Sequence, residues 1–139
     1  MEVVFKNCAG LDVHKRMIVA CALVSSATGV QRHVKTCQTT LAGLETLGGW
    51  LTSLGVTHVA MESTGVYWKP VFNVLAPLME VWVVNASHLK QVPGRKTDIK
   101  DAEWIAQLMR LGLLKRSFIP DVAQRDLRDL TRYRTRLLG

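Results

Sequence analysis

The sequence predicts an α/β fold in which helices flank a mixed five-stranded sheet. Its first part holds three strand-like segments separated by short polar turns, which is typical of an antiparallel meander. Its middle part alternates strand-like with helix-like segments, which is typical of parallel strands joined by right-handed crossovers. The 139 residues, 48% of them hydrophobic, suit one globular domain with its own core.

The expected meander occupies the first 38 residues. Residues 3–13 are rich in Val, Phe and Cys, and 17–26 form a nearly continuous apolar run, as a strand buried on both faces does. Residues 30–38 alternate in the way of a third strand. The polar residues 14–16 and the segment 27–29 are expected to form the two turns.

The next segments introduce helices. Residues 39–55 place leucines at helical spacing, with Thr40 as the expected N-cap and Gly55 just past the end. A strand at 56–62, a helix at 66–78 and a strand at 80–86 follow. By analogy, a meander followed by this alternation has the order of the ribonuclease-H-like fold.

The last third is expected to hold two more helices. The first spans about 98–111 and packs on the sheet through Ala102, Ile105 and Met109, with Leu113 as a further candidate. The expected boundaries are 1–112 for the sheet domain, 113–120 for a connector and 121–139 for the start of a coiled-coil helix. An amphipathic helix that folds back on the domain is the alternative for this last segment.

Charge and composition favour a nucleic-acid partner. The net charge is +7, which suits a polyanion, although a basic protein without such a partner is the alternative. No apolar run approaches the roughly 20 residues of a membrane span, and we expect no signal peptide. The three cysteines have no C-x-x-C spacing, which favours reduced thiols in a cytosolic protein. The candidate nucleic-acid contacts are Arg95, Lys96, Lys100, Arg125, Arg128 and Arg132.

Four acidic residues are candidates for one site. Asp12 and Glu62 follow apolar segments that we expect to be neighbouring parallel strands, so their side chains should meet at one end of the sheet. Asp98 and Asp101 lie on the apolar side of the helix that packs on that sheet. Carboxylates this close repel one another unless a cation lies between them.

Mg²⁺ or Mn²⁺ is the cation that this ligand set favours, because Mg²⁺ takes oxygen ligands and usually only a few carboxylates. Two such ions, about 3.5–4 Å apart, can clamp the attacking and leaving oxygens of a phosphodiester. In the alternative interpretation, Asp98 and Asp101 only cap their helix. Thr97 is also a suitable N-cap, which leaves Asp98 available for the site.

Three motifs carry a family resemblance: GLDVHK (10–15), MESTGVYWKPV (61–71) and GRKTDIKDAEWIAQLMRLGLL (94–114). In this order they resemble the N-terminal domain of the D-E-D-D insertion-sequence transposases, which are related to the Piv-type DNA invertases. The resemblance implies a RuvC-like, ribonuclease-H-like catalytic domain with a metal tetrad. The matching positions are Asp12, Glu62, Asp98 and Asp101.

The resemblance also implies features beyond this chain. Family members continue through a coiled coil into a second domain with a serine implicated as nucleophile. It further implies donor and target DNA, a structured guide RNA, a dimer or tetramer, and action at the nucleoid of a prokaryotic cytoplasm. A stand-alone RuvC-like junction nuclease and a non-catalytic nucleic-acid-binding or dimerisation module remain as alternatives.

Overall fold

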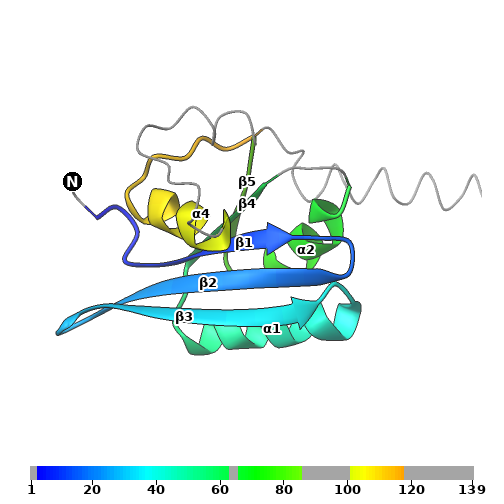
Figure 1. Cartoon of the computed structure of the whole chain (residues 1–139), viewed down its shortest axis with the longest axis horizontal. Helices are drawn as coiled ribbons and strands as arrows, with labels where there is room; N and C mark the ends of the chain where they lie inside the picture. Colours follow the sequence, from blue (N-terminus) through cyan, green and yellow to red (C-terminus); the bar gives the residue numbers. More distant parts are fainter. Residues whose placement is uncertain (1–2, 63–65, 86–100, 118–139) are drawn as a thin grey trace, which may run out of the picture.

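The computed structural model describes residues 3–62, 66–85 and 101–117, and it confirms the predicted α/β fold (Figure 1). The sheet has the strand order β3-β2-β1-β4-β5. β1 is antiparallel to β2 and β2 to β3, whereas β1 is parallel to β4 and β4 to β5. This is the strand arrangement expected from the sequence. The elements are β1 (Asn7–Val13), β2 (Met17–Ser26), β3 (Gly29–Gln38), α1 (Leu41–Ser53), β4 (His58–Glu62), α2 (Trp68–Leu75), β5 (Glu80–Val84) and α4 (Asp101–Arg110).

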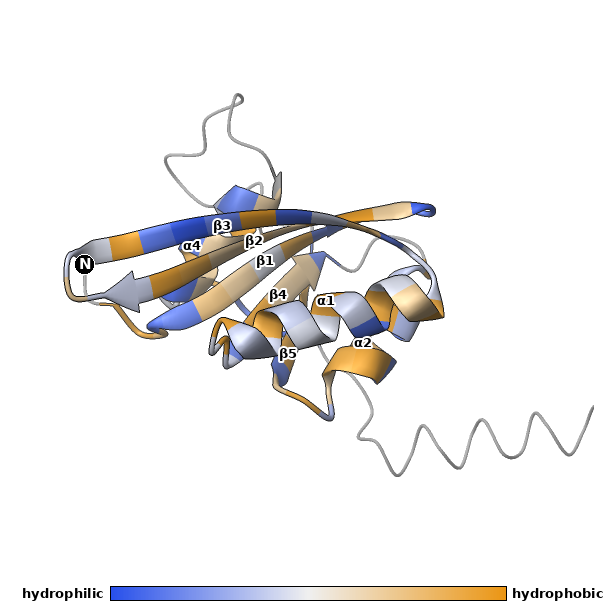
Figure 2. Cartoon of the chain, turned by 90° about the horizontal axis from the view of Figure 1, so that it is seen from below, coloured by the Kyte–Doolittle hydropathy of each residue, from blue (hydrophilic) through white to orange (hydrophobic). Residues whose placement is uncertain are grey.

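Helices cover both faces of the sheet. α1 and α2 pack on one face, where alternate strand residues such as Leu11, Val59 and Met61 join their leucines in one core. α4 packs on the other face, where Cys8, Cys21 and the remaining alternate residues meet it (Figures 1 and 2). The alternation of side chains along each strand therefore decides which helix a residue meets.

The caps of α1 agree with the prediction, and the helix, Leu41–Ser53, lies between them. Thr40 is the N-cap, and its hydroxyl oxygen accepts a hydrogen bond from the Gly43 N–H at 3.0 Å. Gly55, with φ of +74°, follows the C-cap residue in the left-handed conformation that glycine adopts at little cost.

β1 begins at Asn7, so the expected strand at 3–13 was too long at its start. The ladder to β2 begins with the pair Asn7 and Val24. Val4 instead donates its N–H to the Arg110 carbonyl at the end of α4, at 2.9 Å. The β-branched residues before Asn7 thus lie against a helix end rather than a strand.

The exit from α4 corrects another prediction. Leu113 is exposed, and Leu114 takes the buried position instead. The cause is Gly112, whose φ of +70° ends the helical path before Leu113. The chain then runs along β5, where the Ser117 N–H donates to the Val83 carbonyl at 2.7 Å.

Three further expectations concern the last segment, the cysteines and membrane spans. The expected start of a coiled-coil helix at 121–139, and the alternative of an amphipathic helix there, fall outside the described residues. Cys8, Cys21 and Cys37 are free and buried, as expected of reduced thiols. No helix in the described ranges is long and apolar enough to cross a membrane.

Candidate metal centre

Asp12 and Glu62 lie at the carboxyl ends of two adjacent parallel strands. The paired residues Leu11 of β1 and Met61 of β4 immediately precede the two acids. Both of these neighbours point into the core under α1 and α2. Because strand side chains alternate, Asp12 and Glu62 point to the opposite face, which is the face that α4 covers. Both acids are half-buried.

α4 approaches this end of the sheet with its N-terminus. A Cβ atom added at Gly10, two residues before Asp12 on the same face, would collide with the Ala102 carbonyl oxygen and the Ala106 amide nitrogen. Farther back along β1, the Cys8 thiol donates to the Ala106 carbonyl at 3.5 Å, and the chain before β1 meets the end of α4. α4 therefore runs antiparallel to β1, and its first residue, Asp101, lies at the Asp12 end of the strand.

The Asp12 carboxylate has a hydrogen-bond partner in His14. His14 Nε2 lies 2.9 Å from Asp12 Oδ2, with 54% and 25% of the two side chains exposed. Donation by the Nε2–H fixes the direction of one carboxylate oxygen and leaves the other for further ligands. The sequence places His14 two residues after Asp12, on the same side of a strand, as a candidate contact for a metal-bound water or a phosphate. A turn histidine in solvent was the favoured expectation, and the direct bond to Asp12 was not predicted.

The structure describes the other predicted site residues only in part. The backbone of Asp101 is described as the start of α4, but its side chain is not, and Asp98 lies outside the described residues. Within the described ranges, no group of three or more His, Cys, Asp or Glu side chains is close enough to hold a metal ion. The candidate nucleic-acid contacts Arg95, Lys96, Lys100, Arg125, Arg128 and Arg132 also lie outside those ranges.

The described donors suit a hard cation. Asp12 and Glu62 supply carboxylate oxygens, which Mg²⁺ and Mn²⁺ prefer, and their partial exposure leaves room for water or phosphate oxygens. The thiols of Cys8 and Cys21 are buried under α4, and burial raises the pKa of Cys8 to about 12 and that of Cys21 to about 11. These thiols therefore stay protonated at neutral pH and are poor metal ligands.

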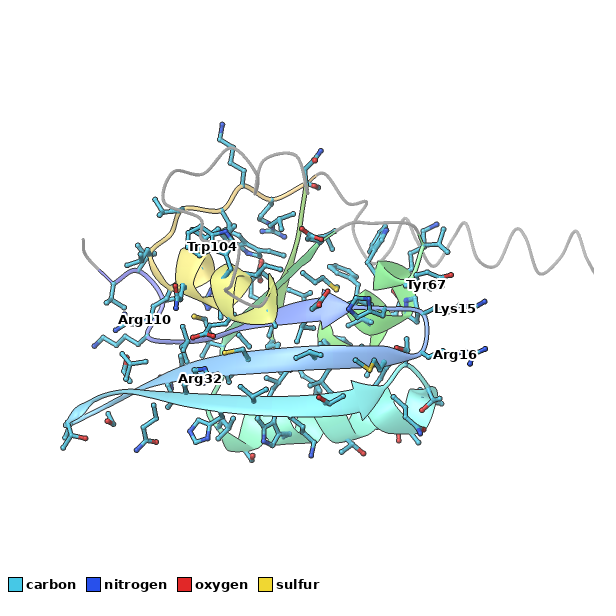
Figure 3. All side chains as sticks on the ribbon, viewed as in Figure 1. Lys15, Arg16, Arg32, Tyr67, Trp104 and Arg110 are labelled. Atoms are coloured by element: carbon cyan, nitrogen blue, oxygen red, sulfur yellow. The ribbon has the colours of Figure 1, made fainter. Side chains whose placement is uncertain are left out.

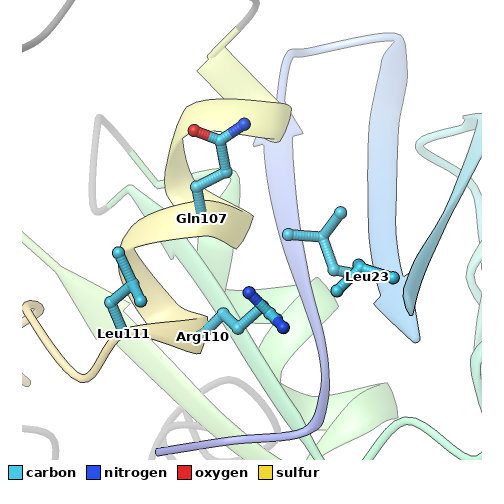
Figure 4. Close-up of a pocket in the computed structure, with 5 residues that line it drawn as sticks. Leu23, Gln107, Arg110 and Leu111 are labelled. Carbon is cyan, nitrogen blue, oxygen red and sulfur yellow. The ribbon is translucent and has the colours of Figure 1, made fainter. Parts of the chain in front are cut away.

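A pocket of about 280 Å³ opens at the other end of the same face (Figure 4). Leu23, Val30, Gln107, Arg110 and Leu111 line it. Leu23 pairs with Cys8, four residues before Asp12, and Arg110 is the last residue of α4. The pocket is therefore separate from the acidic end of the sheet.

A family model of DEDD transposases of the IS110 type, described as "Transposase", matches residues 9–139. The chain belongs to this transposase family. The match includes Asp12, Glu62 and α4. No curated protein matches the sequence.

A solved structure with a similar fold is that of the Fowlpox virus resolvase in complex with substrate Holliday junction DNA. Its identity to this chain is 12% and the TM-score is 0.45. The similarity covers 66% of this chain and 65% of the resolvase chain, which is slightly less than two thirds of the resolvase.

Proposed function

We propose that this chain is the metal-dependent catalytic domain of a DNA transposase, which cleaves and exchanges DNA strands at phosphodiester bonds. The observation that carries the proposal is the placement of Asp12 and Glu62. They end adjacent parallel strands on the face where α4 begins, in a chain that belongs to a transposase family. Sites of open α/β sheets form outside the carboxyl ends of parallel strands.

In this proposal, Asp12 and Glu62 supply ligands from the sheet, and Asp98 and Asp101 supply them from the start of the helix. The cofactor is Mg²⁺ or Mn²⁺, as a pair of ions. When bound, the ions stabilise charge on the attacking and leaving oxygens of the phosphodiester. The protein's own part is to hold the acids at the sheet end, with His14 keeping the Asp12 carboxylate in one direction.

The partners in this proposal are donor DNA and target DNA. Arg95, Lys96 and Lys100 hold DNA phosphates beside the acids, and Arg125, Arg128 and Arg132 extend the basic surface. We further propose a structured guide RNA, assembly as a dimer or tetramer, and action at the nucleoid of a prokaryotic cytoplasm. In the same proposal, 113–120 connects the domain of 1–112 to a coiled coil and a serine-bearing second domain.

The alternative is an autonomous RuvC-like junction nuclease, which needs no second domain. Incubating the 139-residue chain with Mn²⁺ and branched DNA separates the two proposals. The transposase proposal predicts no cutting by this chain alone, because its nucleophilic serine belongs to the second domain. Efficient cutting that disappears in Asp12→Asn would favour the nuclease.

The main test measures strand exchange by the full-length transposase in a plasmid assay. We expect Asp12→Asn and Glu62→Gln to reduce exchange by at least about 100-fold, since each change removes a charged ligand without changing side-chain size. Glu45→Gln, an exposed acid on α1 on the far face of the sheet, is the matched control and should retain exchange. Retained exchange in the Asp12 and Glu62 variants would contradict the proposal.

A further inference from the structure

The turn between β1 and β2 is a tight hairpin with two cations at its tip. The register pairs Val13 with Ile18, and the His14 N–H donates to the Met17 carbonyl at 2.9 Å. Lys15 and Arg16 therefore form a two-residue loop. Loops this short restrict the directions that their side chains can take.

The end of β3 fixes this turn from the outside. The Thr39 hydroxyl donates to the His14 carbonyl at 2.8 Å, and the Thr39 N–H donates to the Arg16 carbonyl at 3.0 Å. The carbonyls of His14 and Arg16, one on each side of Lys15, thus have partners. The backbone that carries the two cations is anchored to a second strand end and is not held by the hairpin alone.

The two cationic side chains are available to a ligand. Lys15 and Arg16 are both exposed, and Figure 3 shows them projecting outward from the turn. Within residues 3–62, 66–85 and 101–117, neither side chain forms an ion pair, whereas Arg32 and Arg116 pair with Glu103 and Glu80. Two neighbouring guanidinium and ammonium groups without a carboxylate partner are suited to bind an anion.

The turn is coupled to the acidic end of the sheet. It begins two residues after Asp12, and its first residue, His14, is hydrogen-bonded to the Asp12 carboxylate. Carboxylates repel DNA phosphates, so a strand that reaches Asp12 and Glu62 gains from fixed positive charge beside them. Lys15 and Arg16 are the nearest cations in sequence to Asp12, on a backbone whose position is fixed relative to it.

We propose that Lys15 and Arg16 form a phosphate-binding site that holds the DNA strand entering the acidic centre. This inference rests on the proposed function and adds a DNA contact outside the basic segments around Arg95 and Arg125. The contact is to the phosphate backbone, so it positions the strand and does not read its sequence.

The test measures DNA binding in EDTA, so that no metal and no reaction contribute. The 139-residue chain, wild type and Lys15→Gln/Arg16→Gln, is titrated with fluorescent branched DNA at several salt concentrations. The binding constant falls as salt rises, and each lost phosphate contact makes the plot of log K against log salt less steep by about 1. The slope of the double variant should therefore be smaller in magnitude by about 2. Each single variant should lose about 1, which keeps the test available if the double variant does not fold.

Lys6→Gln is the matched control. Lys6 is exposed and precedes β1, at the opposite end of the strand from Asp12, so its loss should leave the salt slope unchanged. Exchanging the cations, as Lys15→Arg/Arg16→Lys, should retain the slope because both charges remain. Thermal melting of each variant checks that the fold persists.

Two outcomes would overturn the inference. One is an unchanged slope in the Gln variants, and the other is a slope that becomes less steep in these variants for a structured RNA but not for DNA. Failure here is distinct from failure of the proposed function. An unchanged slope together with lost strand exchange in Asp12→Asn would overturn only the phosphate site. A reduced slope together with normal exchange in Asp12→Asn would overturn only the catalytic proposal.

Discussion

His14 Nε2 lies 2.9 Å from Asp12 Oδ2, and this contact joins the basic turn to the acidic end of β1. The imidazole is more than half exposed, so it contributes little to the core. Its one polar contact within the described residues is to the Asp12 carboxylate. We therefore propose that His14 positions the Asp12 carboxylate and does not stabilise the core.

We expect His14→Ala to weaken Mn²⁺ binding by about 10- to 100-fold, because hydrogen-bond partners of ligating carboxylates have effects of this size. The free energy of unfolding should change little, since the side chain is exposed. Calorimetric titration with Mn²⁺ and urea denaturation measure the two quantities. The control is His33→Ala, a half-buried residue of β3. Equal Mn²⁺ affinity in the His14 variant and the wild type would refute the positioning role.

The second prediction concerns the close approach of α4 to β1. Gly10→Ala would place a methyl group against backbone atoms of Ala102 and Ala106, which cannot move as a flexible side chain can. We expect a loss of about 1–3 kcal/mol in the free energy of unfolding, measured in urea. α4 should also shift from the sheet end, so Mn²⁺ binding should weaken with it.

Gly49→Ala provides the matched control for that change. Gly49 is exposed within α1, and nothing lies within 4 Å of an added Cβ atom. Alanine should therefore stabilise α1 by up to about 1 kcal/mol. If Gly10→Ala were as stable as Gly49→Ala, the contact between Gly10 and α4 would have to be absent in solution.

The third prediction concerns alkaline pH. Burial raises the pKa of Cys8 to about 12, from an ordinary value of 9.0, so the folded state keeps the thiol protonated while the unfolded state ionises it above pH 9. Stability from this difference is fully present below pH 9 and is lost as the pH rises from 9 toward 12. Cys8→Ala should show a shallower fall in the free energy of unfolding than wild type between pH 8 and 11. Parallel curves for the two proteins would contradict a buried, neutral thiol.

Local sequence signals predicted the elements well where the signal and the tertiary contact coincide. β2 was predicted as Met17–Ser26 because turns bound an apolar run on both sides, and the cap at Thr40 follows from its hydroxyl. Local sequence signals did not predict where β1 begins. Val3 and Val4 have strand propensity, but the Val4 N–H donates to the Arg110 carbonyl at the end of α4, and the ladder begins only at Asn7.

The candidate site was likewise predicted in part, and the rest depends on tertiary contacts. The sequence predicted that the strands of Asp12 and Glu62 are parallel neighbours, because crossover connections leave few alternatives. It also predicted that Ala102, Ile105 and Met109 face the sheet. The His14 contact with Asp12 depends on one rotamer in a tight turn, and the burial of Leu114 in place of Leu113 depends on the backbone angle at Gly112. Neither the rotamer nor the angle is encoded in hydrophobic periodicity.

We propose above that Asp12 and Glu62 belong to one metal centre with Asp98 and Asp101. The most direct measurement is Mn²⁺ binding to the 139-residue chain by electron paramagnetic resonance, which separates free from bound ion. We expect wild type and Glu45→Gln to bind Mn²⁺ with equal affinity. The variants Asp12→Asn, Glu62→Gln, Asp98→Asn and Asp101→Asn should each weaken binding by more than about 100-fold, since losing a ligand exceeds the cost of losing an outer-shell partner. Unchanged Mn²⁺ affinity in the Asp12 and Glu62 variants would contradict a metal centre built on these two residues.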